Sequence, residues 1–193
     1  MKLRQKVMPH LWYAKEAEAA ARFYASIFPN SSVDRVTSLP VDTPSGPAGT
    51  VKVVDFRLFG QRFQAISAGP LDPFNHAVSF VVLCEDQAEL DRYWKALLKG
   101  GGEPEMCGWL RDKFGLSWQI VPAELDEMMS DPDRERAIRV CEVMLRQQKL
   151  DIGALRAAYE AAPSRERSRK PKASARRART SRKSPRSRRS TAR

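Results

Sequence analysis

An internal duplication most constrains how this chain can fold, because the order and spacing of its apolar segments occur twice. Shifting the first half by 70 positions places Leu11–Glu16 (LWYAKE) on Val81–Asp86 (VVLCED). Shifting its last apolar segment by 55 positions places Gly60–Ile66 (GQRFQAI) on Gly115–Val121 (GLSWQIV). The two shifts differ because the first half carries the extra Pro- and Gly-rich loop Pro40–Gly49. A repeat of this kind indicates two copies of one structural unit.

Each copy has the pattern of a strand, a helix and further strands. Alternating apolar residues favour strands, and apolar residues three and four positions apart favour helices. In the first copy the predicted strands are Val7–Ala14, Ser32–Leu39, Thr50–Phe59 and Arg62–Ser67, and the predicted helix is Glu16–Phe28. In the second copy the predicted strands are Ala77–Cys84, Glu105–Leu110 and Leu116–Pro122, and the predicted helix is Asp86–Leu98.

Beyond the second copy the pattern becomes helical. Asp131-Pro132-Asp133 is a start signal for a helix from Arg134 to Gln148, and Asp151 starts a shorter helix through Tyr159. We therefore predict an α+β protein of two βαβββ modules followed by C-terminal helices and a basic tail. The predicted boundaries are 1–70, 71–125, 126–163 and 164–193.

The net charge of +11 comes from the C-terminal segment. Fourteen of the 34 Lys and Arg residues, but one of the 23 acidic residues, lie between Ser164 and Arg193. The preceding residues therefore hold 20 basic and 22 acidic side chains and are close to neutral. The segment has no aromatic residue and no aliphatic residue larger than Ala, so we expect it to be disordered.

A segment of this composition suits phosphate groups, and its binding would be non-specific and dependent on salt. The candidate nucleic-acid-binding residues are Arg176, Arg177, Arg179, Arg182, Lys183, Arg186, Arg188 and Arg189. The alternative is a solvated extension without a partner.

Several classes of protein are disfavoured by composition. No apolar run approaches the length that spans a membrane, and Met1–Val7 lacks the apolar stretch of a signal peptide. The cysteines Cys84, Cys107 and Cys141 are widely spaced, which indicates reduced thiols. We expect a cytoplasmic protein without a membrane partner.

The segments Ala17–Ser31 (AEAAARFYASIFPNS), Phe74–Val82 (FNHAVSFVV) and Cys107–Pro122 (CGWLRDKFGLSWQIVP) carry a family resemblance. With Lys149–Leu155 (KLDIGAL), they resemble the PhnB-like group of the vicinal oxygen chelate superfamily, whose members are often labelled 3-demethylubiquinone-9 3-methyltransferase-like. The resemblance implies a cleft formed by the sheets of two modules, and a homodimer. A methyltransferase needs a glycine-rich turn between a strand and a helix, whereas Gly100–Gly102 ends a helix.

The resemblance also implies four positions that hold a divalent metal in many relatives. They lie on the first and last strand of each module. When the sequence is aligned on the predicted helices, these positions are occupied by Pro9 and Gln64 in the first module and by Ser79 and Gln119 in the second. Proline cannot ligate, and amides and hydroxyls are poor ligands for zinc or a transition metal. We therefore predict no cofactor. His10 and His76 are the alternative metal ligands, although alternation along the strand would turn His10 to the opposite face.

Without a metal, the cleft would be polar at its centre. Gln64 and Gln119 are related by the repeat and offer both donors and acceptors to a carbonyl or hydroxyl group, or they bond each other and the backbone. Ser79, Trp109 and Cys107 complete the predicted ligand-binding set. Three hypotheses follow: a small-molecule-binding protein without metal, a metal-dependent glyoxalase- or dioxygenase-type enzyme, and a nucleic-acid-associated protein.

Overall fold

The computed structural model describes residues 5–70 and 73–162. The predicted basic tail, including every candidate nucleic-acid-binding residue, lies outside the described residues. Within the described segments, no helix is long and apolar enough to cross a membrane.

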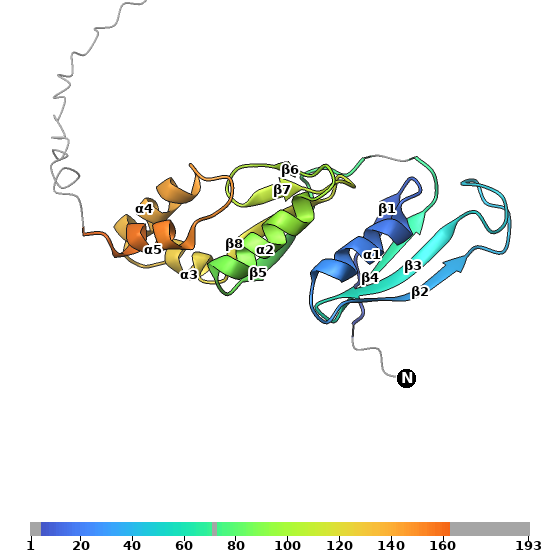
Figure 1. Ribbon diagram of the computed structural model, residues 1–193, viewed down its shortest axis with the longest axis horizontal. Helices are drawn as coiled ribbons and strands as arrows, with labels where there is room; N and C mark the ends of the chain where they lie inside the picture. Colours follow the sequence, from blue (N-terminus) through green and yellow to red (C-terminus); the bar gives the residue numbers. More distant parts are fainter. Residues whose placement is uncertain (1–4, 71–72, 163–193) are drawn as a thin grey trace, which may run out of the picture. The chain divides into compact units, whose positions relative to one another are not determined.

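The duplication predicted from the sequence is confirmed by two four-stranded sheets of the same topology (Figure 1). The first module contains β1 (His10–Tyr13), α1 (Ala17–Ile27), β2 (Ser32–Ser38), β3 (Lys52–Leu58) and β4 (Gln61–Ser67), with the sheet order β1-β4-β3-β2. The second contains β5 (Phe80–Cys84), α2 (Gln87–Leu98), β6 (Glu103–Pro104), β7 (Trp109–Arg111) and β8 (Ser117–Pro122), with the order β5-β8-β7-β6. In each sheet the first strand runs parallel to the last strand of its module.

One predicted strand is confirmed only at its end, where Trp109 and Leu110 belong to β7. The segment predicted to be extended from Glu105 to Leu110 is largely a turn that joins β6 to β7. Cys107 and Gly108 both have positive φ values, 61° and 82°, and consecutive left-handed residues reverse the chain instead of extending it.

Each helix covers one face of its own sheet and leaves the other face open (Figure 1). In β4, Phe63 and Ala65 are buried beneath the helix, whereas Gln64 and Ile66 alternate with them on the opposite face. In β5, Val82 and Cys84 are buried, whereas Val81 and Leu83 are 52% and 62% exposed. We call these two uncovered surfaces the open faces of the modules.

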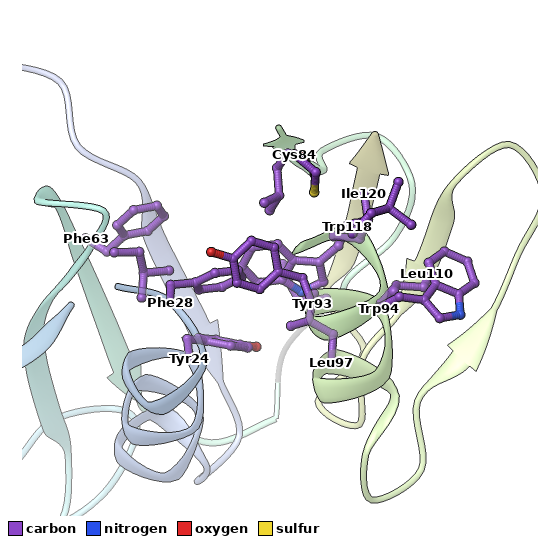
Figure 2. Packing of buried hydrophobic residues seen from close by; sticks show 14 of the residues in the cluster. Tyr24, Phe28, Phe63, Cys84, Tyr93, Trp94, Leu97, Leu110, Trp118 and Ile120 are labelled. Atoms are coloured by element: carbon purple, nitrogen blue, oxygen red, sulfur yellow. Dashed lines mark hydrogen bonds between the residues drawn. The ribbon is translucent and has the colours of Figure 1, made fainter. Parts of the chain in front are cut away.

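The helix-covered sides of the two modules share one aromatic core (Figure 2). The ring of Phe28, directly after α1, lies 5.1 Å from that of Tyr93 in α2 and 5.4 Å from that of Trp118 in β8. Tyr24, one turn earlier in α1, packs 5.3 Å from the same Trp118 ring. These rings come from both halves of the repeat, so neither half has a complete core of its own.

The C-terminal region forms α3 (Leu125–Met129), α4 (Arg134–Met144) and α5 (Ile152–Glu160). The predicted caps are confirmed, because Asp133 accepts from the backbone N–H of Glu135 and Asp151 from that of Ala154. Helix α4 ends four residues earlier than predicted.

The residues that follow α4 contact the second module through the backbone. The carbonyl oxygens of Gln147 and Gln148 accept hydrogen bonds from the N–H groups of Cys107 and Gly108. This pairing joins the C-terminal helices to the β6–β7 turn.

Candidate ligand-binding site

The open face of the first module carries a row of four polar side chains, one from each strand. His10 in β1 is the register partner of Gln64 in β4, Gln64 is the partner of Asp55 in β3, and Asp55 is the partner of Arg35 in β2. Register partners in a sheet point to the same face. His10 therefore lies on the face of Gln64, and the expectation that it points to the opposite face is wrong.

The connection between the first strand and the helix also differs between the two modules. Three residues, Ala14–Glu16, separate β1 from α1, but two, Glu85 and Asp86, separate β5 from α2. The helices are therefore related by 70 positions and the first strands by 71, so that His10 corresponds to Val81. The first-strand residues in register with Gln64 and Gln119 are therefore His10 and Val81, in place of the predicted Pro9 and Ser79.

Hydrogen bonds fix the orientation of this row. The carboxamide Nε2 of Gln64 donates to Oδ1 of Asp55 at 2.8 Å, and the guanidinium of Arg35 donates twice to Oδ2 of Asp55, at 2.9 and 2.6 Å. Burial alone would raise the pKa of Asp55, but the bonds from Gln64 and Arg35 hold this pKa below its usual value. An ionised carboxylate only accepts, so Gln64 must turn its nitrogen toward Asp55 and leave its carbonyl oxygen free.

The open face of the second module gathers most of the residues predicted there. Gln119 is the register partner of both Val81 and Trp109, and its Nε2 donates to Ser79 Oγ at 2.9 Å. The ring of Trp109 also lies 5.9 Å from the imidazole of His76, measured between centroids. Ser79, Trp109, Gln119 and His76 therefore belong to one cluster.

Glu105 completes this cluster and was not identified from the sequence. Its Oε2 lies 2.7 Å from Nε2 of His76. Its position follows from the turn between β6 and β7, because the backbone N–H of Glu105 donates to the carbonyl of Trp109. The sequence predicts a short strand here, and a strand pattern does not indicate which side chain a turn would bring to His76.

Cys107, the last residue of the predicted set, and the other tryptophans have structural surroundings. Cys107 is half-buried, and its backbone is held by Gln147. Trp94 and Trp118 are buried in the shared core, and Trp12 is half-buried with its indole N–H on the carbonyl of Gly69.

The residues at the corrected metal positions do not fit a transition metal. They are His10, Gln64, Val81 and Gln119, which together supply one imidazole, two neutral carboxamides and an aliphatic side chain. Structural and catalytic zinc sites use at least three imidazole, thiolate or carboxylate ligands. In the described part of the chain, no group of three His, Cys, Asp or Glu side chains could hold a metal ion.

Three cavities of the described residues lie away from the two glutamines. Cavities of about 690, 390 and 510 Å³ open elsewhere on the described residues, and neither Gln64 nor Gln119 lines any of them. The two glutamines also bond different partners, Asp55 and Ser79, so the alternative that they bond each other is not observed.

Comparisons with known proteins agree with this architecture. Residues 5–121 match the family model described as 3-demethylubiquinone-9 3-methyltransferase. The PhnB protein of Bacillus cereus is 32% identical, with 61% of this chain and 98% of that one covered and a TM-score of 0.53. A protein from Pseudomonas aeruginosa is 19% identical (61% and 96% covered, TM-score 0.46), and the fosfomycin resistance protein FosX from Mesorhizobium loti is 11% identical (63% and 93%, TM-score 0.45). No curated protein sequence matches the chain.

Proposed function

Because the chain belongs to the 3-demethylubiquinone-9 3-methyltransferase family, a PhnB-like group of the vicinal oxygen chelate superfamily, we propose that its open faces bind a small molecule without a metal. The observation that carries the proposal is the pair Gln64 and Gln119. They occupy repeat-related positions on the last strand of each module, and each is oriented by a hydrogen bond on an uncovered face.

The orientation of Gln64 indicates what the ligand offers. Its nitrogen is used by Asp55, so its carbonyl oxygen remains to accept from the ligand. In the second module, Trp109 supplies an aromatic surface next to Gln119. A ligand with a hydroxyl or N–H donor and a flat apolar part fits both features.

We further propose that a homodimer encloses this site. Val81 and Leu83 are more than half exposed on the open face of the second module, beside the half-buried Val121. An uncovered row of large aliphatic side chains is typical of an interaction surface. Two subunits that pair their open faces would bury this row and surround the glutamines.

Methyl transfer is not part of the proposal. The turns from strand to helix in the two modules are Ala14–Glu16 and Glu85–Asp86, and both contain acidic residues and no glycine. Such turns do not offer the close backbone approach that a nucleotide-like cofactor requires.

Native mass spectrometry of the untagged full chain tests the proposal. We expect a dimer that carries a co-purified molecule, retained after treatment with a metal chelator. Gln64→Ala and Gln119→Ala should each lose this molecule, and Gln61→Ala, an exposed glutamine at the start of the same strand β4, should keep it. A stoichiometric metal ion that disappears in His10→Ala or His76→Ala would instead support the enzyme hypothesis.

The charge distribution favours a second activity in the same chain. Fourteen basic residues and one acid between Ser164 and Arg193 suit a non-specific contact with nucleic acid. Binding to a duplex of random sequence should weaken steeply with salt and disappear when the chain ends at Pro163. Unchanged binding after that truncation would reject this activity.

A further inference from the structure

A groove of about 510 Å³ lies between the ends of α1 and α2. Phe23 and Ile27 from α1 form its apolar part, and Arg92, Lys99 and Lys113 supply its charged groups. The volume is in the range of pockets that hold small organic ligands. It is on the helix-covered side of both sheets and shares no residue with the glutamine clusters.

The charge of this groove is not neutralised by its own lining. Three cationic side chains line it, and no Asp or Glu does. Arg92 contacts Glu89 at 3.3 Å, but neither Lys99 nor Lys113 forms an ion pair with any described residue. The larger groove of about 690 Å³ differs, because there Glu18 pairs with both Arg22 and Lys52.

Lys113 is held across the groove by neutral groups. Its ammonium lies 4.4 Å from the ring centroid of Phe23 and 5.0 Å from that of Phe114. Its stem passes over Gly100, where a Cβ atom would lie 3.2 Å from Cδ of Lys113. Aromatic faces attract a cation without cancelling its charge. The ammonium is therefore positioned and still able to pair with an anion.

We infer that this groove binds an organic anion with an apolar body, such as an aromatic or acyl carboxylate. The carboxylate pairs with Lys99 and Lys113, and the apolar body lies on Phe23 and Ile27. A purely inorganic anion would leave the apolar part of the groove uncovered, and a neutral molecule would leave Lys99 and Lys113 unpaired. This site is separate from the small-molecule site proposed on the open faces.

Calorimetric titration of the full chain with 2-naphthoate at constant ionic strength tests the inference. We expect 2-naphthoate to bind at least about tenfold more tightly than the neutral 2-naphthalenemethanol, since two unpaired cations select for the charge. The double variant Lys99→Gln/Lys113→Gln should lose roughly tenfold in affinity. Lys95→Gln removes an exposed charge from α2 outside the groove and should stay within about twofold of wild type.

The basic tail is identical in all these proteins, so it contributes the same background. Equal affinities for naphthoate and the alcohol would overturn the inference, as would a double variant that binds like Lys95→Gln. Gln119→Ala could also lose as much affinity for naphthoate as the double lysine variant does. That result would place the anion on the open face and would also reject the inference. If Gln64→Ala and Gln119→Ala keep the co-purified molecule, the small-molecule site on the open faces is rejected. The lysine variants still decide the anion site.

Discussion

The hydroxyl of Tyr24 in the first module donates a 2.8 Å hydrogen bond to the carboxylate of Asp112 in the second. Asp112 is 3% exposed and also accepts from the indole N–H of Trp118 and from the backbone N–H groups of Phe114 and Leu116. Four donors compensate the burial of one carboxyl group, and one of them comes from the other half of the repeat. The contact between the modules is therefore polar at its centre and aromatic around it.

Removing the Tyr24 hydroxyl should destabilise the protein measurably. Tyr24→Phe keeps the packed ring but deletes a hydrogen bond to a buried carboxyl group, which costs about 2 kcal/mol in the free energy of unfolding. Tyr159→Phe is the matched control, because it removes a tyrosine hydroxyl from the less buried Asp131. Urea denaturation of both variants measures the difference, and equal losses would contradict the importance of the Tyr24–Asp112 bond.

Asp112 should also give the stability a distinctive pH dependence. Burial raises the pKa of this carboxyl group above its usual value of 3.8, and hydrogen bonds from Trp118 and Tyr24 oppose the rise only in part. The folded state therefore binds a proton at a higher pH than the unfolded state does. Its contribution to stability is fully present below pH 3.8 and decreases as the pH rises through the raised folded-state pKa.

The comparison with Asp112→Asn isolates this effect. The carboxyl groups with lowered pKa values, such as Asp34 and Asp91, act in the opposite direction but are common to both proteins. We expect the unfolding free energy of wild type, minus that of Asp112→Asn, to grow as the pH is lowered from 7 towards 4. A difference that shrinks over this range would show that the folded-state pKa is not raised.

The helices α1 and α2 should respond differently when the acidic residue at the N-cap is replaced by alanine. Asp86 caps α2 by accepting from the backbone N–H of Glu89 at 2.8 Å, whereas Glu16 makes no capping hydrogen bond in α1. Asp86→Ala should cost about 1 kcal/mol, and Glu16→Ala should cost clearly less. Thermal unfolding of the two variants provides the comparison, and similar losses would show that the cap contributes little.

The three cysteines should differ in their reactivity towards alkylating reagents. Cys84 is 1% exposed, and burial raises the pKa of its thiol to about 12. Cys107 and Cys141 are half-buried. Since the thiolate is the reactive form, iodoacetamide at pH 8 should leave Cys84 unmodified in the folded protein and modify it in urea. Peptide mass mapping of both samples checks this, and early labelling of Cys84 would indicate local opening of β5.

The repeat could be read from the sequence because its most regular parts are the helices and the last strands. Arg22, Phe23 and Tyr24 recur 70 positions later as Arg92, Tyr93 and Trp94, and Gln64 of the last strand recurs 55 positions later as Gln119. These repeated residues predicted the two modules, whereas the caps of the C-terminal helices were predicted separately, from Asp133 and Asp151.

The site was only partly predictable because the position of each first strand relative to its helix does not follow from the repeat. The connection before α2 is one residue shorter than the one before α1, and the register places His10 and Val81 beside the glutamines, one and two residues after the predicted Pro9 and Ser79. The partners Asp55 and Glu105 were missed for another reason. Their contacts with Gln64 and His76 join different strands or a turn, and such contacts leave no local trace in a sequence.

The hydrogen bond between Tyr24 and Asp112 means that the two halves have become complementary partners. The strand register places Arg111 at the position of Arg57, so that Asp112 corresponds to Leu58, a buried aliphatic residue. A chain built from two copies of the first module would therefore present an aliphatic side chain where the acceptor is needed. Loss or exchange of either repeat by recombination would break the core, so the duplication can no longer be reversed in a single step.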